Sequence, residues 1–224
     1  MNTANPDYHA RLEQIQVYHK QLWIELRDLF HFYRALCDDH RGAAEAAVSR
    51  AALFLFFGAM ETATRVMAAA SLAISSDSEA SLERRLTETE SLFLQERVAE
   101  IRERDWSTAS RTRFVSLESK LIGYPVIYAR LFGIEIQIDR TSVEWQSFLR
   151  LKTLRDLGAH GSLLPTEVGP ERVSAADLHQ LLVTRRWYCA ALQDLPWLAG
   201  AEARGEIGAI DMLLACISRP CTSQ

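Results

Sequence analysis

The chain has 224 residues, of which 48% are hydrophobic and 24% are charged. This balance predicts a soluble globular protein with a substantial core and excludes a disordered chain, and we expect one domain that spans residues 1–224. The formal net charge of −4 gives the whole molecule no attraction for nucleic acid or for an anionic membrane, so an RNA site would need a local basic patch.

The N-terminal residues and the cysteines predict a cytoplasmic protein. Residues 1–10 include Asp7 and lack the apolar stretch of a secretory signal. The most apolar run, residues 51–60, is about half as long as the ~20 residues that cross a bilayer, so we expect no membrane association. The four cysteines form no Cys-x-x-Cys pair, which indicates reduced thiols that pack in the fold.

The first half of the chain has the apolar periodicity of helices. Over residues 8–37 apolar side chains recur every three or four positions, which predicts a long first helix that Gly42 interrupts. Residues 43–74 are rich in alanine and apolar on most faces, as the central and most buried helix of a bundle would be. A capping-box pattern at residues 76–79 predicts a third helix from there to about Trp106.

The second half begins with a polar connection at residues 107–113. Residues 114–132 have a helical pattern, but Pro125 lacks an amide donor, so we expect two short pieces or a kink there. Residues 133–138 are predicted to be an extended loop, and a second capping-box pattern begins at Thr141. Three later helices are predicted at residues 141–161, 174–195 and 203–217.

Patterns for metal or nucleotide binding are missing from the sequence. A di-iron bundle needs Glu-x-x-His pairs on two helices, and the chain has none, while the similarly spaced Asp28 and His31 stand alone. The chain lacks both phosphate-binding glycine patterns, Gly-x-x-x-x-Gly-Lys-Ser/Thr and Gly-x-Gly-x-x-Gly. No serine lies in the Gly-x-Ser-x-Gly turn of a hydrolase. We therefore predict no metal and no cofactor.

One segment, Leu-Arg-Asp-Leu-Gly-Ala-His-Gly at residues 154–161, has a pattern with chemical meaning. It resembles the signature of the HEPN superfamily, in which an Arg is followed directly by a polar residue and, four to six residues past the Arg, by a His. Arg155, Asp156 and His160 occupy these positions. The resemblance covers about residues 43–195, and the N-terminal helix and C-terminal tail are additions to it.

The resemblance implies an all-α, HEPN-like helical bundle of about six or seven helices that dimerises through its motif helices. It also implies a metal-independent endoribonuclease of the toxin or antiviral-defence type, which cleaves RNA by 2′-hydroxyl attack. An antitoxin or another protein would be its partner. Because many HEPN domains are not catalytic, a module that binds a partner protein, RNA or a nucleotide stays open as the alternative.

The three motif residues suit this chemistry. An unperturbed imidazole titrates near neutral pH, so we expect His160 to act as a general acid or base. Arg155 would hold the phosphate, and Asp156 would orient the His160 ring. On an ideal helix Asp156 and His160 share a face, whereas Arg155 lies about 140° away from His160. The homodimer that the resemblance implies would bring the Arg and the His together in one cleft.

Basic residues near the motif are the candidates for phosphate binding. We expect Lys120, Arg150 and Lys152 to contact the RNA backbone. The alternative is that these cations belong to solvated helix faces, where most Lys and Arg residues lie. In that interpretation His160 is at a helix end only because its charge favours the negative pole of the helix dipole.

Overall fold

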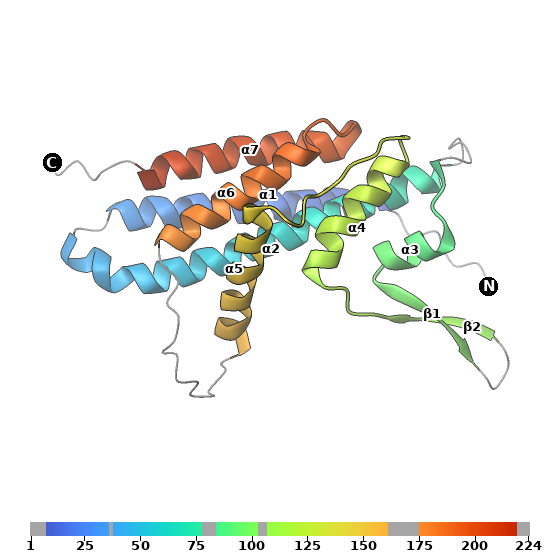
Figure 1. Ribbon diagram of the computed structural model, residues 1–224, viewed down its shortest axis with the longest axis horizontal. Coiled ribbons are helices and arrows are strands. Elements are labelled where there is room, and N and C mark those ends of the chain that lie inside the picture. The colour runs from blue at the N-terminus through green and yellow to red at the C-terminus, as the bar shows by residue number, and fades with distance from the viewer. Residues whose placement is uncertain (1–7, 36–37, 78–83, 103–106, 161–174, 219–224) are drawn as a thin grey trace.

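The computed structural model describes residues 8–35, 38–77, 84–102, 107–160 and 175–218 (Figure 1). Over these residues the protein consists of α-helices and one β-hairpin. This confirms the all-α class that the sequence predicted. The elements in chain order are α1 (Tyr8–Ala35), α2 (Asp38–Ser76), α3 (Glu88–Leu94), β1 (Arg97–Arg102), β2 (Ser107–Thr112), α4 (Leu117–Arg130), α5 (Val143–His160), α6 (Ala175–Leu192) and α7 (Trp197–Ser218).

The long helices form the body of the molecule. Figure 1 shows α1, α2 and α7 running along the longest axis, with α5 lying across that axis and α3, β1 and β2 gathered at one end. Helix α2 contacts α1, α4, α5, α6 and α7, so it is the central element that its alanine-rich, apolar sequence predicted.

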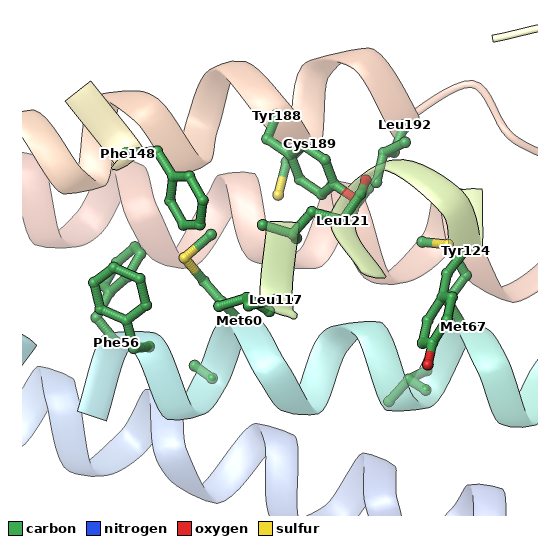
Figure 2. Close-up of a cluster of buried hydrophobic side chains, with 14 of the residues drawn as sticks. Phe56, Met60, Met67, Leu117, Leu121, Tyr124, Phe148, Tyr188, Cys189 and Leu192 are labelled. Carbon is green, nitrogen blue, oxygen red and sulfur yellow. The ribbon is translucent and has the colours of Figure 1, made fainter. Parts of the chain in front are cut away.

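Helix α2 supplies more buried residues than any other element in the described part of the chain. Phe56, Met60 and Met67 of α2 face apolar side chains from the later helices, among them Tyr124 of α4 and Phe148 of α5 (Figure 2). The buried residues form one contiguous cluster. Burial of this apolar area is the main source of stability, at roughly 25 cal/mol for each Å² removed from water.

Length and composition alone would allow residues Ala47–Ser76 of α2 to cross a bilayer. In the folded chain, 61% of the most apolar window of this helix is buried inside the protein. The core helix of a soluble protein has the same properties, so this helix is weak evidence for or against a membrane.

The third helix predicted from residue 76 to about Trp106 is wrong over most of the part that the structure describes. The helix found there, α3, covers only Glu88–Leu94, and the Thr87 hydroxyl caps it within a true capping box with Glu90. Glu96 follows with a φ of 54°, the left-handed conformation that ends helices, and β1 begins at the next residue. The capping-box pattern expected at residues 76–79 extends beyond the described residues.

The polar connection expected at residues 107–113 is also wrong. Strand β2 occupies Ser107–Thr112 and pairs with β1 in an antiparallel hairpin, with Arg97 opposite Thr112 and Arg102 opposite Ser107. The backbone groups of this stretch are therefore satisfied by a partner strand that local periodicity could not reveal.

Helix α4 is continuous through Pro125, so the two short pieces expected there are wrong. Pro125 has no N–H to donate to the carbonyl oxygen of Leu121, one turn earlier. The Tyr188 hydroxyl of α6 donates to that oxygen instead, at 2.6 Å. A tertiary hydrogen bond thus replaces the one that proline removes.

The remaining helices are confirmed, with shifted ends. Gly42 lies inside α2 rather than between the first two helices, and α7 begins at Trp197, before the expected start at residue 203.

The residue that caps α5 is Ser142 rather than Thr141, because the Ser142 hydroxyl accepts from the Trp145 N–H at 3.1 Å. Residues 133–138 form no helix or strand, as expected. The loop expected after Gly161 lies outside the described residues.

Gly123 allows α4 to approach α3 closely. A Cβ at this position would lie 2.6 Å from Cε1 of Phe93. The Phe93 ring is fixed by an edge-on contact with Tyr124, with ring centroids 5.3 Å apart. A side chain at position 123 would therefore have to displace a packed aromatic ring.

We expect Gly123→Ala to lower the free energy of unfolding by ~1–2 kcal/mol, because overpacking outweighs the better helix propensity of alanine. Gly208→Ala in α7 is the matched control, since nothing lies within 4 Å of a Cβ there. That change should raise the free energy of unfolding by ~0.5–1 kcal/mol. Urea denaturation measures both, and changes of the same sign would contradict this account of Gly123.

Candidate functional site

The motif lies on α5, and aromatic packing sets the position of this helix. Phe148 of α5 packs against Phe57 of α2, with ring centroids 5.7 Å apart, and Trp145 packs against Phe148 at 5.3 Å. Arg155 continues the contact, because its guanidinium carbon lies 4.7 Å from the centroid of the Phe57 ring. The first motif residue is thus held against the central helix by a cation–π interaction.

Asp156 lies between two cations. The Arg155 Nε donates to Oδ1 of Asp156 at 2.8 Å, and Nη2 of Arg155 donates to the same oxygen. Lys152, one turn earlier, donates to Oδ2 at 2.8 Å and lies 3.3 Å from Oε1 of Glu118 in α4. All of these side chains are partly exposed, at 22% for Arg155 and Lys152 and 34% for Asp156.

These contacts shift the pKa values of Asp156 and Lys152 in the directions that favour their charged forms. Burial alone would raise the pKa of Asp156, but the hydrogen bonds and charges of Lys152 and Arg155 lower that pKa below its ordinary value. The hydrogen bond to Asp156 raises the pKa of Lys152. A carboxylate accepts about four hydrogen bonds, so Asp156 retains room at Oδ2 for one more donor, such as an imidazole N–H.

His160 lies in the last turn of α5, where the sequence predicted it. Its side chain is outside the described residues, as is everything from Gly161 to residue 174. The contact between Asp156 and His160 therefore stays a prediction. The helical backbone places the two residues four positions apart, on one face of α5.

The predicted phosphate-binding cations are all paired with carboxylates. Lys120 is 3% exposed, and its Nζ lies 2.8 Å from Glu96 and 3.4 Å from Glu61. This lysine joins α4 to α2 and to the end of α3. Arg150 forms an ion pair with Asp177 of α6. Contacts of Lys120, Arg150 and Lys152 with RNA stay predictions.

Among the described residues, the side chains around the motif are close to neutral rather than basic. The cations Arg150, Lys152 and Arg155 contact the carboxylates Asp177, Glu118 and Asp156. Two basic residues on neighbouring elements are paired as well, Arg130 with Glu90 and Arg186 with Asp211. A phosphate that binds here would have to exchange with these carboxylates.

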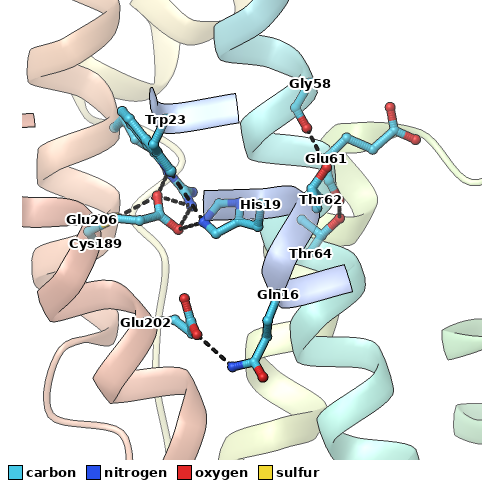
Figure 3. A network of polar contacts seen from close by, with 11 residues as sticks. Gln16, His19, Trp23, Gly58, Glu61, Thr62, Thr64, Cys189, Glu202 and Glu206 are labelled. Atoms are coloured by element: carbon cyan, nitrogen blue, oxygen red, sulfur yellow. Dashed lines mark hydrogen bonds and ion pairs between the residues drawn. The ribbon is translucent and has the colours of Figure 1, made fainter. Parts of the chain in front are cut away.

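Sequence reasoning missed a buried polar network between α1, α6 and α7. Arg185 forms two hydrogen bonds with the carboxylate of Glu206, at 2.7 and 2.8 Å, and these side chains are 2% and 5% exposed. His19 Nε2 lies 3.1 Å from Glu206 and 3.2 Å from the Trp23 indole nitrogen (Figure 3). Cys189 approaches the same carboxylate at 3.6 Å.

Burial would raise the pKa of Glu206, but Arg185 and the hydrogen bond with His19 lower it to about 2. The carboxylate is therefore charged throughout the neutral range. A sequence signal for this network did exist, because His19, Arg185 and Glu206 each interrupt an apolar helix stripe. A charged residue on such a stripe needs a buried partner.

The described residues contain no group of three or more His, Cys, Asp or Glu side chains arranged to hold a metal ion. The cavity beside Arg185 and Glu206 has a volume of about 20 Å³, enough for roughly one water molecule. Comparisons of this chain with protein-family models, with curated proteins and with solved structures found no match.

Proposed function

We propose that this chain is a HEPN-like, metal-independent endoribonuclease of the toxin or antiviral-defence type. The observation that carries the proposal is the Arg155–Asp156 pair on α5, held against Phe57 one turn before His160. A cation, a carboxylate fixed in its charged form and a histidine on the same helix end are the groups that RNA transesterification uses. The motif and the all-α fold together support this class.

In the proposed reaction the 2′-oxygen of RNA forms a bond to the adjacent phosphorus and the bond from phosphorus to the 5′-oxygen breaks. A base takes the proton of the 2′-hydroxyl, and an acid gives a proton to the departing 5′-oxygen. His160 serves as acid or base, Asp156 orients its ring, and Arg155 stabilises the charge on the phosphate oxygens. The products are a 2′,3′-cyclic phosphate and a free 5′-hydroxyl.

A homodimer is part of this proposal. Arg155 and His160 lie on different sides of α5, and Arg155 is directed toward Phe57 of α2. Two copies of the motif helix facing each other would place the Arg of one chain near the His of the other. The two His160 residues could then divide the acid and base roles.

The test is incubation of the purified full chain with single-stranded RNA in excess EDTA. Because the nucleophile is the substrate's own hydroxyl and the described residues offer no metal-binding group, cleavage should proceed at the same rate with and without the chelator. DNA of the same sequence lacks the 2′-hydroxyl and should stay intact. Activity that EDTA abolishes and Mg²⁺ or Mn²⁺ restores would contradict the proposed chemistry.

A specific observation favours a second function, a non-catalytic HEPN-like module that binds a partner protein, RNA or a nucleotide. The cations around the motif are neutralised by carboxylates, which weakens the attraction for an RNA backbone. The same RNA assay separates the two functions. The module predicts intact RNA at every protein concentration, with or without divalent cations.

A further inference from the structure

A cleft of about 470 Å³ lies at the end of the bundle that carries α3 and β1. Its walls come from the beginning of α1, the second half of α2, the turn between α3 and β1, and α4. This volume is within the range of pockets that bind small molecules, roughly 300–1,000 Å³. No local sequence pattern indicates this cleft, because its residues come from four separate segments of the chain.

Three arginines line the cleft. They are Arg11 of α1, Arg65 of α2 and Arg97 of β1. One carboxylate, Glu96, also lines the cleft, but Lys120 lies 2.8 Å from it and offsets its charge. Glu61 also contacts Arg65, so the three arginines and Lys120 together outnumber the two carboxylates beside them, on a chain whose net charge is −4. Guanidinium groups bind phosphate oxygens through paired hydrogen bonds, so an anion with phosphate groups suits this lining.

Arg65 is well placed to exchange its present partner for a ligand. Its ion pair with Glu61 spans 3.2 Å, and the side chain is 58% exposed. Exposed pairs of this kind contribute little to stability, so releasing Glu61 costs little. Glu61 would retain its contact with Lys120, at 3.4 Å. A bound phosphate would gain the Arg65 charge without leaving a buried carboxylate unpaired.

Part of the cleft lining is apolar. It includes the buried Ala68 and Leu72 of α2, the buried Leu94 of α3 and the partly buried Tyr8. An inorganic ion would leave this apolar lining in contact with water. A ligand that joins a phosphate group to a flat ring would cover the apolar lining with the ring and present the phosphate to the arginines.

From these observations we propose that the cleft is a binding site for a small phosphorylated compound with a flat aromatic ring, the chemistry of a mononucleotide. The site is separate from the α5 motif. Arg155 contacts α2 at Phe57, whereas the cleft uses α2 from Arg65 to Leu72. In Figure 1, α3 and β1 lie at one end of the molecule, away from α5. The proposal therefore holds whether or not the motif is catalytic.

Isothermal titration calorimetry of the full chain with AMP tests this proposal, with adenosine and inorganic phosphate as the partial ligands. AMP should bind saturably with a dissociation constant below about 1 mM, and each partial ligand should bind at least ~10-fold more weakly. The double variant Arg11→Ala, Arg65→Ala should weaken AMP binding by ~30-fold or more, because it removes two charged hydrogen-bond donors.

The matched control is Arg27→Ala, Arg50→Ala, which removes the same charge from the same two helices at exposed positions outside the cleft. Its AMP affinity should stay within about twofold of wild type, because distant exposed charges are screened by salt. Three results would overturn the proposal: no saturable AMP binding below about 1 mM, equal weakening by the control pair, or binding of a short oligoribonucleotide in the cleft without binding of AMP.

Discussion

Replacing His160 with alanine should lower RNA cleavage by ~100-fold or more, the scale expected when a general acid or base is lost. Arg155→Ala should have a similar effect, because the charge on the phosphate oxygens would lose its stabilising guanidinium. Asp156→Asn should be milder than His160→Ala, since an amide oxygen still accepts a hydrogen bond from the imidazole. Initial rates with a labelled single-stranded RNA measure all three variants.

These variants must be shown to fold. His160 is in the last turn of α5, where a substitution usually changes stability by less than about 0.5 kcal/mol. Arg155→Ala also loses the contact with Phe57, at a cost of about 1 kcal/mol. His179→Ala, at an exposed position on α6, is the matched control and should keep full activity. A folded His160→Ala variant with full activity would reject the nuclease and favour the binding module.

The second large effect concerns stability. Arg185→Ala or Glu206→Gln should each lower the free energy of unfolding by ~3–5 kcal/mol, because each leaves the other member of a buried pair without its partner charge. Arg186→Ala and Asp211→Asn are the controls from the same two helices. Their ion pair is about half exposed, so these two changes should lower the free energy of unfolding far less than changes in the buried pair. Urea denaturation at pH 7 compares the four variants.

The Glu206 effect should depend on pH in a defined direction. The pKa of this carboxyl is lowered to about 2 in the folded protein, from an ordinary value of 4.5. Its stabilising contribution is therefore fully present above the unfolded pKa and is lost as the pH falls toward 2. The stability difference between wild type and Glu206→Gln should shrink below pH 4.5, and a difference that stays constant down to pH 2 would contradict this role.

The double variant Arg185→Leu, Glu206→Leu tests whether the loss comes from an unpaired buried charge. Replacing both partners with apolar residues of similar size is often close to neutral. We therefore expect the double variant to be more stable than either single charge deletion. If it were less stable than both, packing of the two long side chains would matter more than their charges.

Local patterns in the sequence predicted those helices that bury a continuous apolar stripe, namely α1, α2, α5, α6 and α7. They failed where a distant partner decides the outcome. Strand β1 exists because β2 pairs with it, and α4 continues through Pro125 because Tyr188 bonds the free carbonyl. Periodicity has no information about such partners.

The candidate site was also predicted only in part from the sequence. The sequence identified Arg155, Asp156 and His160 as a motif at the end of a helix, and the structure places them at the end of α5. It did not identify the carboxylates that neutralise the surrounding cations, because Glu118 and Asp177 come from α4 and α6. The order of residues along the chain indicated a basic patch, whereas in the described part of the structure the cations near the motif are balanced by carboxylates.

The most direct test of the nuclease proposal is mass spectrometry of the RNA fragments that the wild-type protein and His160→Ala release in EDTA. Wild type should yield fragments that end in a 2′,3′-cyclic phosphate, with free 5′-hydroxyls on the other side of each cut. His160→Ala, at equal concentration of folded protein, should yield these fragments ~100-fold more slowly. Fragments with 3′-hydroxyl and 5′-phosphate ends, or equal yields from the two proteins, would contradict a motif-based ribonuclease.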